Sequence, residues 1–464
     1  MTNSKSRPLI YFSSLELENV RCFGERQVLQ LADDQGQPFQ WTLLLGDNGV
    51  GKTTLLQCLA WMRPVPYLGT GEEEDTPKEI QPALTDEEND VLASLLRAGS
   101  KVALAIKAST TIGRSLPGDD TVQSASEPGE SSIEIGINME GEEGRLQELE
   151  PRRGTYEDDD IALIEPPLFA YGAARHMGKS NLDNMEFADP LASLFSNSIE
   201  LYDAEERLLD LDYLRLTDDK HQKRLQRIKQ VFAAILPDVS GENSIQILGP
   251  RTREDFGEAG GVRFTTPYGD VPLSGLSLGY QTTLAWVLDL AIRLNKHYPE
   301  SENPLAEPAI VLVDEIDLHL HPRWQRQIVA VLSQHFPKTQ FIVTAHSPLM
   351  VQSASDANLV VLQEEDGQVT IENHPDFVEG WRADQILTSR LFDVPARSPR
   401  IQELLDERYS LLIKEERTPL EEQRLQALDK QMDNLPVGSH EEIKAMEIIR
   451  TAAERIKERN SQES

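Results

Sequence analysis

The chain has 464 residues, with 45 lysines and arginines against 78 aspartates and glutamates, so its formal net charge is −33. This charge repels a phosphate backbone and excludes a protein that coats nucleic acid with its whole surface. A nucleic acid would need a local basic groove or a separate basic subunit. The length is sufficient for two or three domains, or for one large α/β domain with insertions.

Cysteine content and hydropathy indicate the compartment. The two cysteines, Cys22 and Cys58, are too few and too far apart for a disulfide framework or a metal knuckle, which favours a reducing cytoplasm. The first residues contain no apolar signal region, and the apolar stretch at 309–313 is far shorter than the roughly 18 residues that cross a bilayer. We therefore expect a cytoplasmic protein without a membrane span.

The first 60 residues alternate between polar and apolar side chains, which predicts a small β-meander leading into a buried strand at 41–45. The segment 71–160 then contains 23 acidic and 8 basic residues. This composition predicts solvated loops around two strands, at 101–109 and 131–139. An acidic surface for a basic partner is the alternative interpretation of this segment.

Apolar residues three and four positions apart predict helices between 189 and 236, and again from near Tyr280. Further strands are expected at 244–249, 262–273, 308–313 and 340–344. A helix at 324–336 separates the last two strands and makes them a βαβ unit. The predicted fold class is therefore α/β, with a mostly parallel core sheet.

Residues 46–53, GDNGVGKT, match the G-x-x-x-x-G-K-[ST] phosphate loop in full, between a predicted strand and a predicted helix. The glycines allow backbone N–H groups to face phosphates, Lys52 neutralises the β and γ oxygens, and the Thr53 hydroxyl ligates Mg²⁺. We predict ATP or GTP binding. The expected contact residues are Gly46, Asp47, Asn48, Gly49, Val50, Gly51, Lys52, Thr53 and Thr54.

The strand AIVLV ends in Asp314 and Glu315. An acid at this point, paired with a phosphate loop, is expected to lie beside Mg²⁺, which is the role predicted for Asp314. Glu315 is then positioned as the general base that activates water. Alone, acids at a strand end are also common as simple caps of the sheet edge.

Residues 276–281, LSLGYQ, resemble the LSxGxQ signature of ABC-type ATPases. The resemblance implies that Ser277, Gly279 and Gln281 contact a nucleotide held by the opposite subunit, and hence a head-to-tail dimer with two ATP molecules at its interface. His346, in TAHSP, matches the switch histidine of the family, which senses the γ-phosphate and acts with Lys52 on transition-state charge.

Two other segments resemble a subclass of this family. IDLHLHP contains His319 and His321, which we expect to be structural, without a metal. PLFAYGAAR places Tyr171, Gly172 and Arg175 near the nucleotide by resemblance, although Arg175 is equally compatible with a pair to a core carboxylate.

The absence of sustained heptads excludes the long arms of SMC-type proteins. The motifs together resemble the overcoming-lysogenization-defect and RecF-like branch of AAA-family ATPases, and the ATPase subunit of Septu-type or retron-linked anti-phage systems. This resemblance implies a separate HNH-type nuclease as the effector partner. No D-x-D follows His346, so nuclease activity within this chain is not expected.

Two alternatives remain open at this stage. One is a DNA-repair or recombination ATPase that grips DNA directly, with the basic run 220–229 lining a groove. The other is a sensor that cages a toxin and releases it on detecting a phage protein.

Four segments are expected along the chain: an ATPase part at 1–190, a helical insertion at 191–240, the second ATPase part at 241–395, and a helical tail at 396–464. The last helix of the tail is predicted to begin at a capping box formed by Ser439 and Glu442.

Overall fold

The computed structural model describes residues 9–67, 79–82, 95, 104–112, 115–117, 132–140, 145–148, 166–175, 178, 189–236, 239, 241–248, 261–354, 356–373, 378, 380–392, 394, 398–414 and 417–432. Most of the acidic segment 71–160, and the predicted capping box at Ser439 and Glu442, lie outside these residues. The chain divides into two compact units, Met1–Asp393 and Val394–Ser464. The finer boundaries at 190 and 240 stay predictions.

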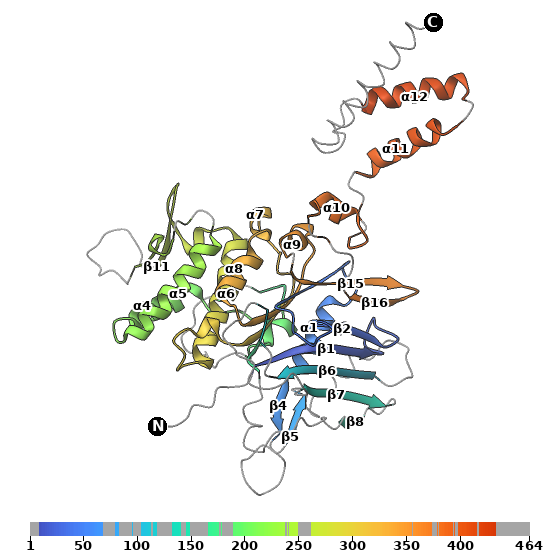
Figure 1. Ribbon diagram of the computed structural model, residues 1–464. Helices are drawn as coiled ribbons and strands as arrows, with labels where there is room; N and C mark the ends of the chain where they lie inside the picture. The colour runs from blue at the N-terminus through green and yellow to red at the C-terminus, as the bar shows by residue number, and fades with distance from the viewer. Residues whose placement is uncertain are drawn as a thin grey trace. The chain divides into compact units, whose positions relative to one another are not determined.

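The core of the first unit is a six-stranded sheet with the order β16-β15-β3-β14-β13-β9. Its strands β15 and β16 lie side by side in Figure 1. Its strands are β3 (Trp41–Gly46), β9 (Leu168–Tyr171), β13 (Ala309–Val313), β14 (Thr339–Thr344), β15 (Asn358–Glu365) and β16 (Gln368–Asn373). All neighbours are parallel except β16, which is antiparallel to β15. The predicted mostly parallel sheet and its βαβ unit are confirmed.

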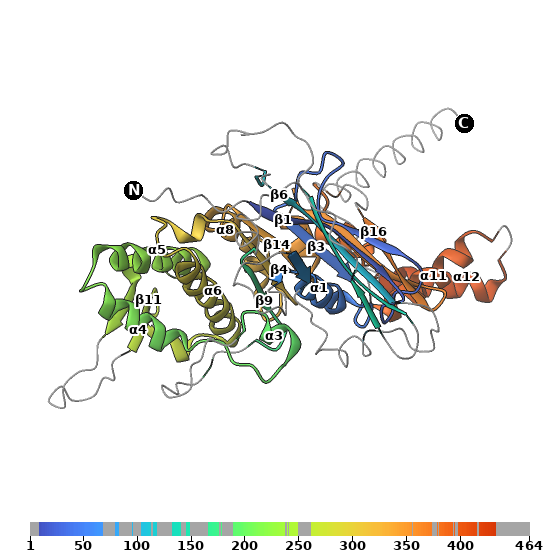
Figure 2. The ribbon, with the colours of Figure 1, turned by 90° about the horizontal axis from the view of Figure 1, so that it is seen from below.

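The central strands are buried on both faces, because alternate side chains enter two different hydrophobic cores. Leu44, Ile310 and Ile342 enter the core shared with α1 (Lys52–Trp61). The next side chains along each strand, such as Leu43, enter the other core. That core is covered by four helices, α4 (Ala204–Leu214), α5 (Asp219–Ile235), α6 (Leu278–His297) and α8 (Ile328–His335) (Figure 2).

A second, antiparallel sheet has the order β2-β1-β6-β7-β8. It consists of β1 (Ile10–Glu18), β2 (Gln27–Gln30), β6 (Leu104–Ile112), β7 (Ser132–Glu140) and β8 (Arg145–Glu148). The Gln340 side chain on β14 joins the two sheets, since it accepts from the Phe12 N–H and donates to the Phe12 carbonyl, both at 2.9 Å. A separate pair, β4 (Pro64–Tyr67) and β5 (Glu79–Pro82), is also antiparallel.

The segment predicted as a strand at 262–273 is instead a hairpin of β11 (Gly261–Thr266) and β12 (Gly269–Pro272), which pairs with β10 (Ile245–Leu248). The chain turns at Pro267 and Tyr268, and β12 begins at Gly269, whose φ of 117° favours glycine. The helix expected near Tyr280 begins at Leu278.

The helix predicted at 324–336 is interrupted. It consists of α7 (Pro322–Gln325) and α8, because the Gln325 carbonyl accepts a hydrogen bond from the Ser353 hydroxyl at 3.0 Å. The shorter helices of the unit are α3 (Ala192–Phe195), α9 (Pro348–Ser353) and α10 (Ala383–Thr388), and 3₁₀ turns occupy Glu242–Ser244, Leu273–Gly275 and Pro304–Ala306.

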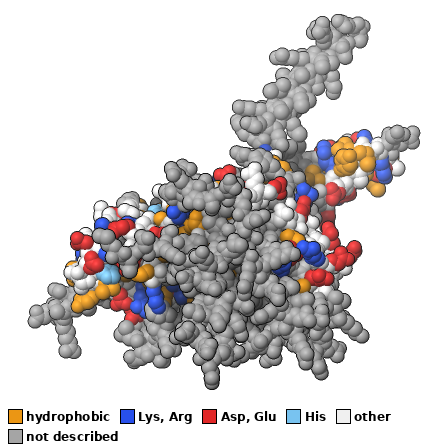
Figure 3. Space-filling view, turned by 60° about the horizontal axis from the view of Figure 1, so that its bottom comes forward, with side chains coloured by type: hydrophobic (Ala, Val, Ile, Leu, Met, Phe, Trp, Pro, Cys, Tyr) orange, Lys and Arg blue, Asp and Glu red, His pale blue; other side chains and the backbone are white. Residues whose placement is uncertain are grey.

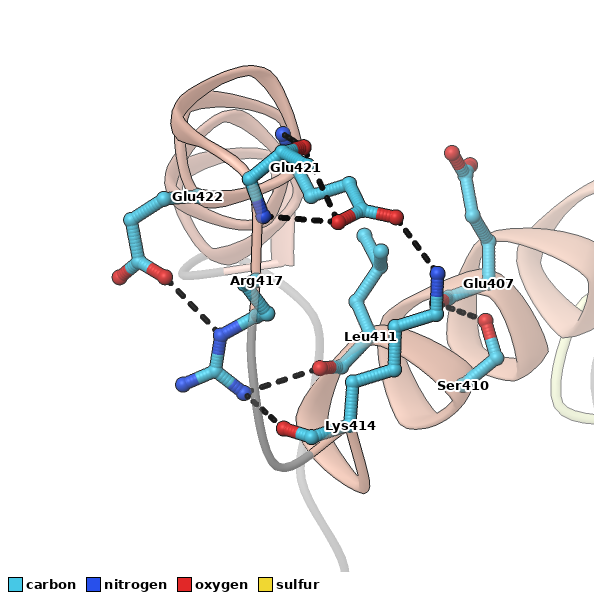
Figure 4. A network of polar contacts seen from close by, with 8 residues as sticks. Glu407, Ser410, Leu411, Lys414, Arg417, Glu421 and Glu422 are labelled. Carbon is cyan, nitrogen blue, oxygen red and sulfur yellow. Dashed lines mark hydrogen bonds and ion pairs between the residues drawn. The ribbon is translucent and has the colours of Figure 1, made fainter.

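The described part of the second unit is a helical hairpin of α11 (Pro399–Leu412) and α12 (Pro419–Met432), as predicted from the sequence. Leu411, Leu425 and Leu428 form its small apolar contact. Figure 4 shows the polar contacts at its turn, where Lys414 pairs with Glu421 at 2.5 Å and Arg417 pairs with Glu422 at 2.9 Å. Among the described residues of the whole chain, no helix is long and apolar enough to cross a membrane.

Candidate functional site

The four motif-bearing strands β3, β14, β13 and β9 are parallel neighbours, so their carboxyl ends meet at one edge of the sheet. The phosphate loop follows β3, and Asp314 and Glu315 follow β13. His346 comes two residues after β14, and Arg175 comes four residues after β9. The fold therefore gathers segments that are more than 250 residues apart in sequence, such as Thr53 and Asp314.

The phosphate loop has the backbone that its glycines predict. Gly46, Gly49 and Gly51 have φ values of 139°, 87° and 89°, a region that side chains rarely adopt. Lys52 opens α1 and reaches back across the loop, with Nζ donating to the carbonyls of Gly46 at 2.8 Å and Asp47 at 2.7 Å. The tip of the loop at 47–49 is exposed and available to a ligand.

Lys52 is buried, and this burial lowers its pKa, while the carboxylates of Asp314 and Glu315 oppose the shift. A buried ammonium that is short of solvent favours an anion as its partner. This is the environment expected of a phosphate-binding lysine.

Asp314 joins the phosphate loop to the centre of the sheet. Its Oδ2 accepts from the Thr53 hydroxyl at 2.8 Å, and its Oδ1 accepts from the Thr344 hydroxyl at 2.7 Å. The pair of Thr53 and Asp314 offers a hydroxyl oxygen and a carboxylate oxygen side by side, which are the hard ligands that Mg²⁺ takes in nucleotide sites. These residues fit the metal that the sequence predicts.

Glu315 is half-buried and has a φ of 48°. Its backbone N–H donates to the Thr344 hydroxyl at 2.6 Å. The exposed His346 lies beside the turn after β13, since its N–H donates to Asp317 Oδ2 at 3.0 Å. The structure thus brings Lys52, Thr53, Asp314, Glu315 and His346 to one edge, as expected from the motifs.

Arg175 lies at this same edge, where its guanidinium bonds backbone carbonyls. Its guanidinium donates to the backbone oxygens of Gly172 at 3.0 Å, Asp314 at 2.5 Å and Glu315 at 2.9 Å. The neighbouring Tyr171 points elsewhere, with its hydroxyl donating to the buried Asp289 of α6 at 2.8 Å.

The signature residues lie at the amino end of α6. Ser277 is the N-cap and is exposed, whereas Gly279 is buried so closely against the His319 carbonyl that an added Cβ would clash with it. Gln281 donates to the carbonyls of Ser274 at 3.1 Å and Leu276 at 2.7 Å, so in this structure it supports its own loop. The signature therefore packs on the turn after β13 and exposes Ser277.

Two functional candidates were missed by the sequence reasoning. Thr344 is part of the TAHSP motif, but the motif does not indicate its partners. The structure places it on β14, between β13 and β3, where it bonds both Asp314 and Glu315. Arg21 has a φ of 45° and donates to the Thr54 hydroxyl at 3.2 Å, next to the phosphate loop. A positive-φ arginine has no sequence signal of its own.

Two other expected features have local roles. His321 caps α7, with Nδ1 accepting from the Arg323 N–H at 3.3 Å. The basic run 220–229 lies on α5, where Lys220 and Lys223 pair with Glu300 and Glu302 at 3.8 and 3.5 Å. Figure 3 shows acidic side chains interspersed with basic ones over the described surface of one face. These contacts do not favour α5 as the wall of a basic groove.

A parallel sheet with a complete phosphate loop after one strand, an Asp-Glu pair after another and an LSxGxQ-like helix start defines an ABC-type P-loop ATPase. The family described as "AAA domain, putative AbiEii toxin, Type IV TA system" matches residues 42–351, which is more than half of the chain, and a second family described as "AAA domain" matches residues 14–63. The chain belongs to the first of these two families, whose model covers residues 42–351.

Curated relatives match a smaller segment. "Septu protein PtuA" of Bacillus mycoides (strain KBAB4) is 39% identical over 141 residues, which are 30% of this chain and 19% of that protein. "Retron Ec83 probable ATPase" of Escherichia coli is 40% identical over 140 residues, covering 30% and 24%. "Retron Vc95 probable ATPase" of Vibrio cholerae is 44% identical over 97 residues, covering 21% and 19%. The match thus spans about a fifth to a quarter of these relatives.

Solved structures with a similar arrangement include an SMC head bound to the C-winged helix domain of ScpA, with a TM-score of 0.42, 16% identity and coverage of 78% of this chain and 97% of that one. The recombination mediator RecF has a TM-score of 0.37 at 12% identity, covering 78% and 98%.

Proposed function

We propose that this chain binds ATP with Mg²⁺ and hydrolyses it to ADP and phosphate. The observation that supports this most is the hydrogen bond between Thr53 and Asp314, which joins the phosphate loop to the acid at the end of β13. A hydroxyl and a carboxylate brought together beside a buried lysine are the groups with which phosphate-loop sites bind Mg²⁺ and phosphate.

The proposed roles follow from the placement of each side chain. Lys52 and the loop N–H groups bind the phosphates, and Thr53 and Asp314 hold Mg²⁺, which supplies charge stabilisation to the phosphate oxygens. Glu315, next in the chain after Asp314, accepts the proton of the attacking water. His346 contacts the γ-phosphate from the end of β14.

We further propose that two chains dimerise head to tail, with the exposed Ser277 of each reaching the nucleotide of the other. Ser277 caps a helix of 20 residues, whose amino-end N–H groups and dipole attract an anion. Gly279 allows this helix end to contact the turn after β13 closely.

The similarity to Septu and retron ATPases supports a role in anti-phage defence, in which the nucleotide state of the dimer gates a separate effector, proposed to be an HNH-type nuclease. The matched segments span only 19% to 24% of these relatives, which contain much further sequence. The effector partnership is therefore proposed from the kinship of the ATPase alone.

The test is Glu315→Gln, which keeps shape but removes the proton acceptor. We expect ATP binding to stay within about threefold of wild type, while turnover falls about 10²- to 10⁴-fold, as for loss of a general base. Phosphate release measures turnover, and sedimentation with MgATP measures the dimer, which should accumulate. Unchanged hydrolysis would exclude Glu315 as the base.

A further inference from the structure

The turn that connects Asp314 to Glu315 has an unusual backbone. Glu315 has a φ of 48°, in the left-handed region that a glutamate rarely adopts, so the surrounding contacts must impose this conformation. The direction of the Glu315 side chain depends on this conformation, because rotating φ would move its Cβ away from the sheet edge.

Two side chains bond the peptide groups on either side of Glu315. The Thr344 hydroxyl accepts from the Glu315 N–H at 2.6 Å and donates to Asp314 Oδ1 at 2.7 Å. From the opposite neighbour strand, Arg175 donates to the carbonyls of Asp314 at 2.5 Å and Glu315 at 2.9 Å. Contacts from β14 and from the end of β9 thus meet on one turn.

Arg175 is buried and held in place at this turn. Only 4% of its surface is exposed, and a further hydrogen bond to the Gly172 carbonyl, at 3.0 Å, ties it to its own loop. Burial lowers its pKa to about 10, a shift opposed by the carboxylates of Asp314, Glu315 and Asp317, so it stays charged at neutral pH. A planar guanidinium reaches several carbonyls in a fixed geometry, which a lysine ammonium does not reproduce.

We propose that Arg175 and Thr344 form a backbone clamp, whose bonds to the Asp314–Glu315 turn hold the Glu315 carboxylate in its productive direction. Both are positioning residues that act on hydrolysis through Glu315, while the phosphate loop binds nucleotide without them. This inference rests on the proposed role of Glu315 as the general base.

A double-mutant cycle tests the clamp in the full chain. Arg175→Lys should lower kcat by about 10- to 100-fold and change KM for ATP by less than about threefold, since ground-state binding is retained. In a Glu315→Gln background, hydrolysis is measured as a single turnover of radiolabelled ATP. There, Arg175→Lys should lower the rate by less than about a further threefold. A loss of equal size in both backgrounds, or no loss in the wild type, would overturn the proposal.

Matched variants separate positioning from folding. Thr344→Ser keeps the hydroxyl and should stay close to wild type, whereas Thr344→Val removes it and should repeat the Arg175→Lys pattern. If Arg175→Lys does not fold, the Thr344→Val cycle decides, and full additivity with Glu315→Gln there would refute the clamp. Arg215→Lys, on an exposed pair with Asp212, is the control and should leave turnover unchanged.

Amide exchange tests the clamp without hydrolysis. In the nucleotide-free protein, Arg175→Lys should raise deuterium uptake of the segment 313–318 but not of α5. If Arg175→Lys raises uptake while Glu315→Gln leaves hydrolysis unchanged, the proposed function of Glu315 is refuted, but the contact between Arg175 and the turn is supported. Unchanged uptake at 313–318 would show that Arg175 does not hold the turn.

Discussion

The substitution Gly279→Ala tests how the signature helix packs on the turn after β13. The added Cβ would clash with the His319 carbonyl, and the turn cannot yield freely, because the Leu320 N–H donates to the Asp317 carbonyl at 3.1 Å and Gln325 donates to the Leu320 carbonyl at 3.2 Å. Because the turn is held, overpacking should cost about 2–3 kcal/mol, the upper part of the usual range of about 1–3 kcal/mol, and alanine returns about 1 kcal/mol of helix propensity. A net cost of about 1–2 kcal/mol remains for keeping the two elements in contact.

The clash lies within one chain, so the free monomer can relieve it by shifting the helix end away from the turn. If the amino end of α6 must keep its place to complete the nucleotide site of the opposite chain, the cost appears on dimerisation. At about 1.36 kcal/mol per tenfold, Gly279→Ala should weaken MgATP-dependent dimerisation by about 5- to 30-fold. ATP affinity of the isolated chain should change by less than about twofold, because Gly279 is not part of the phosphate loop.

The assay is sedimentation velocity over a concentration series with MgATP, in the Glu315→Gln background that is expected to trap the dimer. Lys296→Ala, at the exposed carboxyl end of the same helix, is the matched control and should leave dimerisation unchanged. A dimerisation constant for Gly279→Ala within twofold of its parent would refute the reasoning that the signature helix forms the interface.

Two further predictions concern the neighbourhood of the phosphate loop. Lys52→Ala should abolish ATP binding, since it removes the buried ammonium that faces the loop carbonyls, and wild-type affinity in an equilibrium titration would contradict the phosphate-loop assignment. A thiol reagent such as Ellman's reagent should react with half-buried Cys22 well before Cys58, because burial raises the pKa of Cys58 to about 12 and leaves almost no thiolate at pH 8. Equal rates for both thiols in the native protein would show that Cys58 is not enclosed.

The local motifs were predictable because each is contiguous and has its own physical requirement. A glycine-rich loop between a buried strand and a helix specifies the backbone of 46–53, and strictly apolar strands such as 309–313 predict a sheet that is buried on both faces. The structure confirms these elements. It corrects the segment 262–273, where a two-residue turn at Pro267 and Tyr268 divides one expected strand into two.

Other features depend on which strands are neighbours, and no short segment encodes that order. From the sequence, Arg175 could equally have paired with a carboxylate in the core. It bonds the carbonyls of Asp314 and Glu315 because β9 lies beside β13. Thr344 is an ordinary strand residue until β14 is placed between β3 and β13.

The sequence by itself therefore determined the nucleotide chemistry, since phosphate binding needs only a few adjacent residues in a fixed local conformation. Which side chains support that chemistry depends on the tertiary fold, because their hydrogen bonds exist only once the parallel strands are aligned. These bonds join residues 140 positions apart, as for Arg175 and Glu315, or 261 positions apart, as for Thr53 and Asp314.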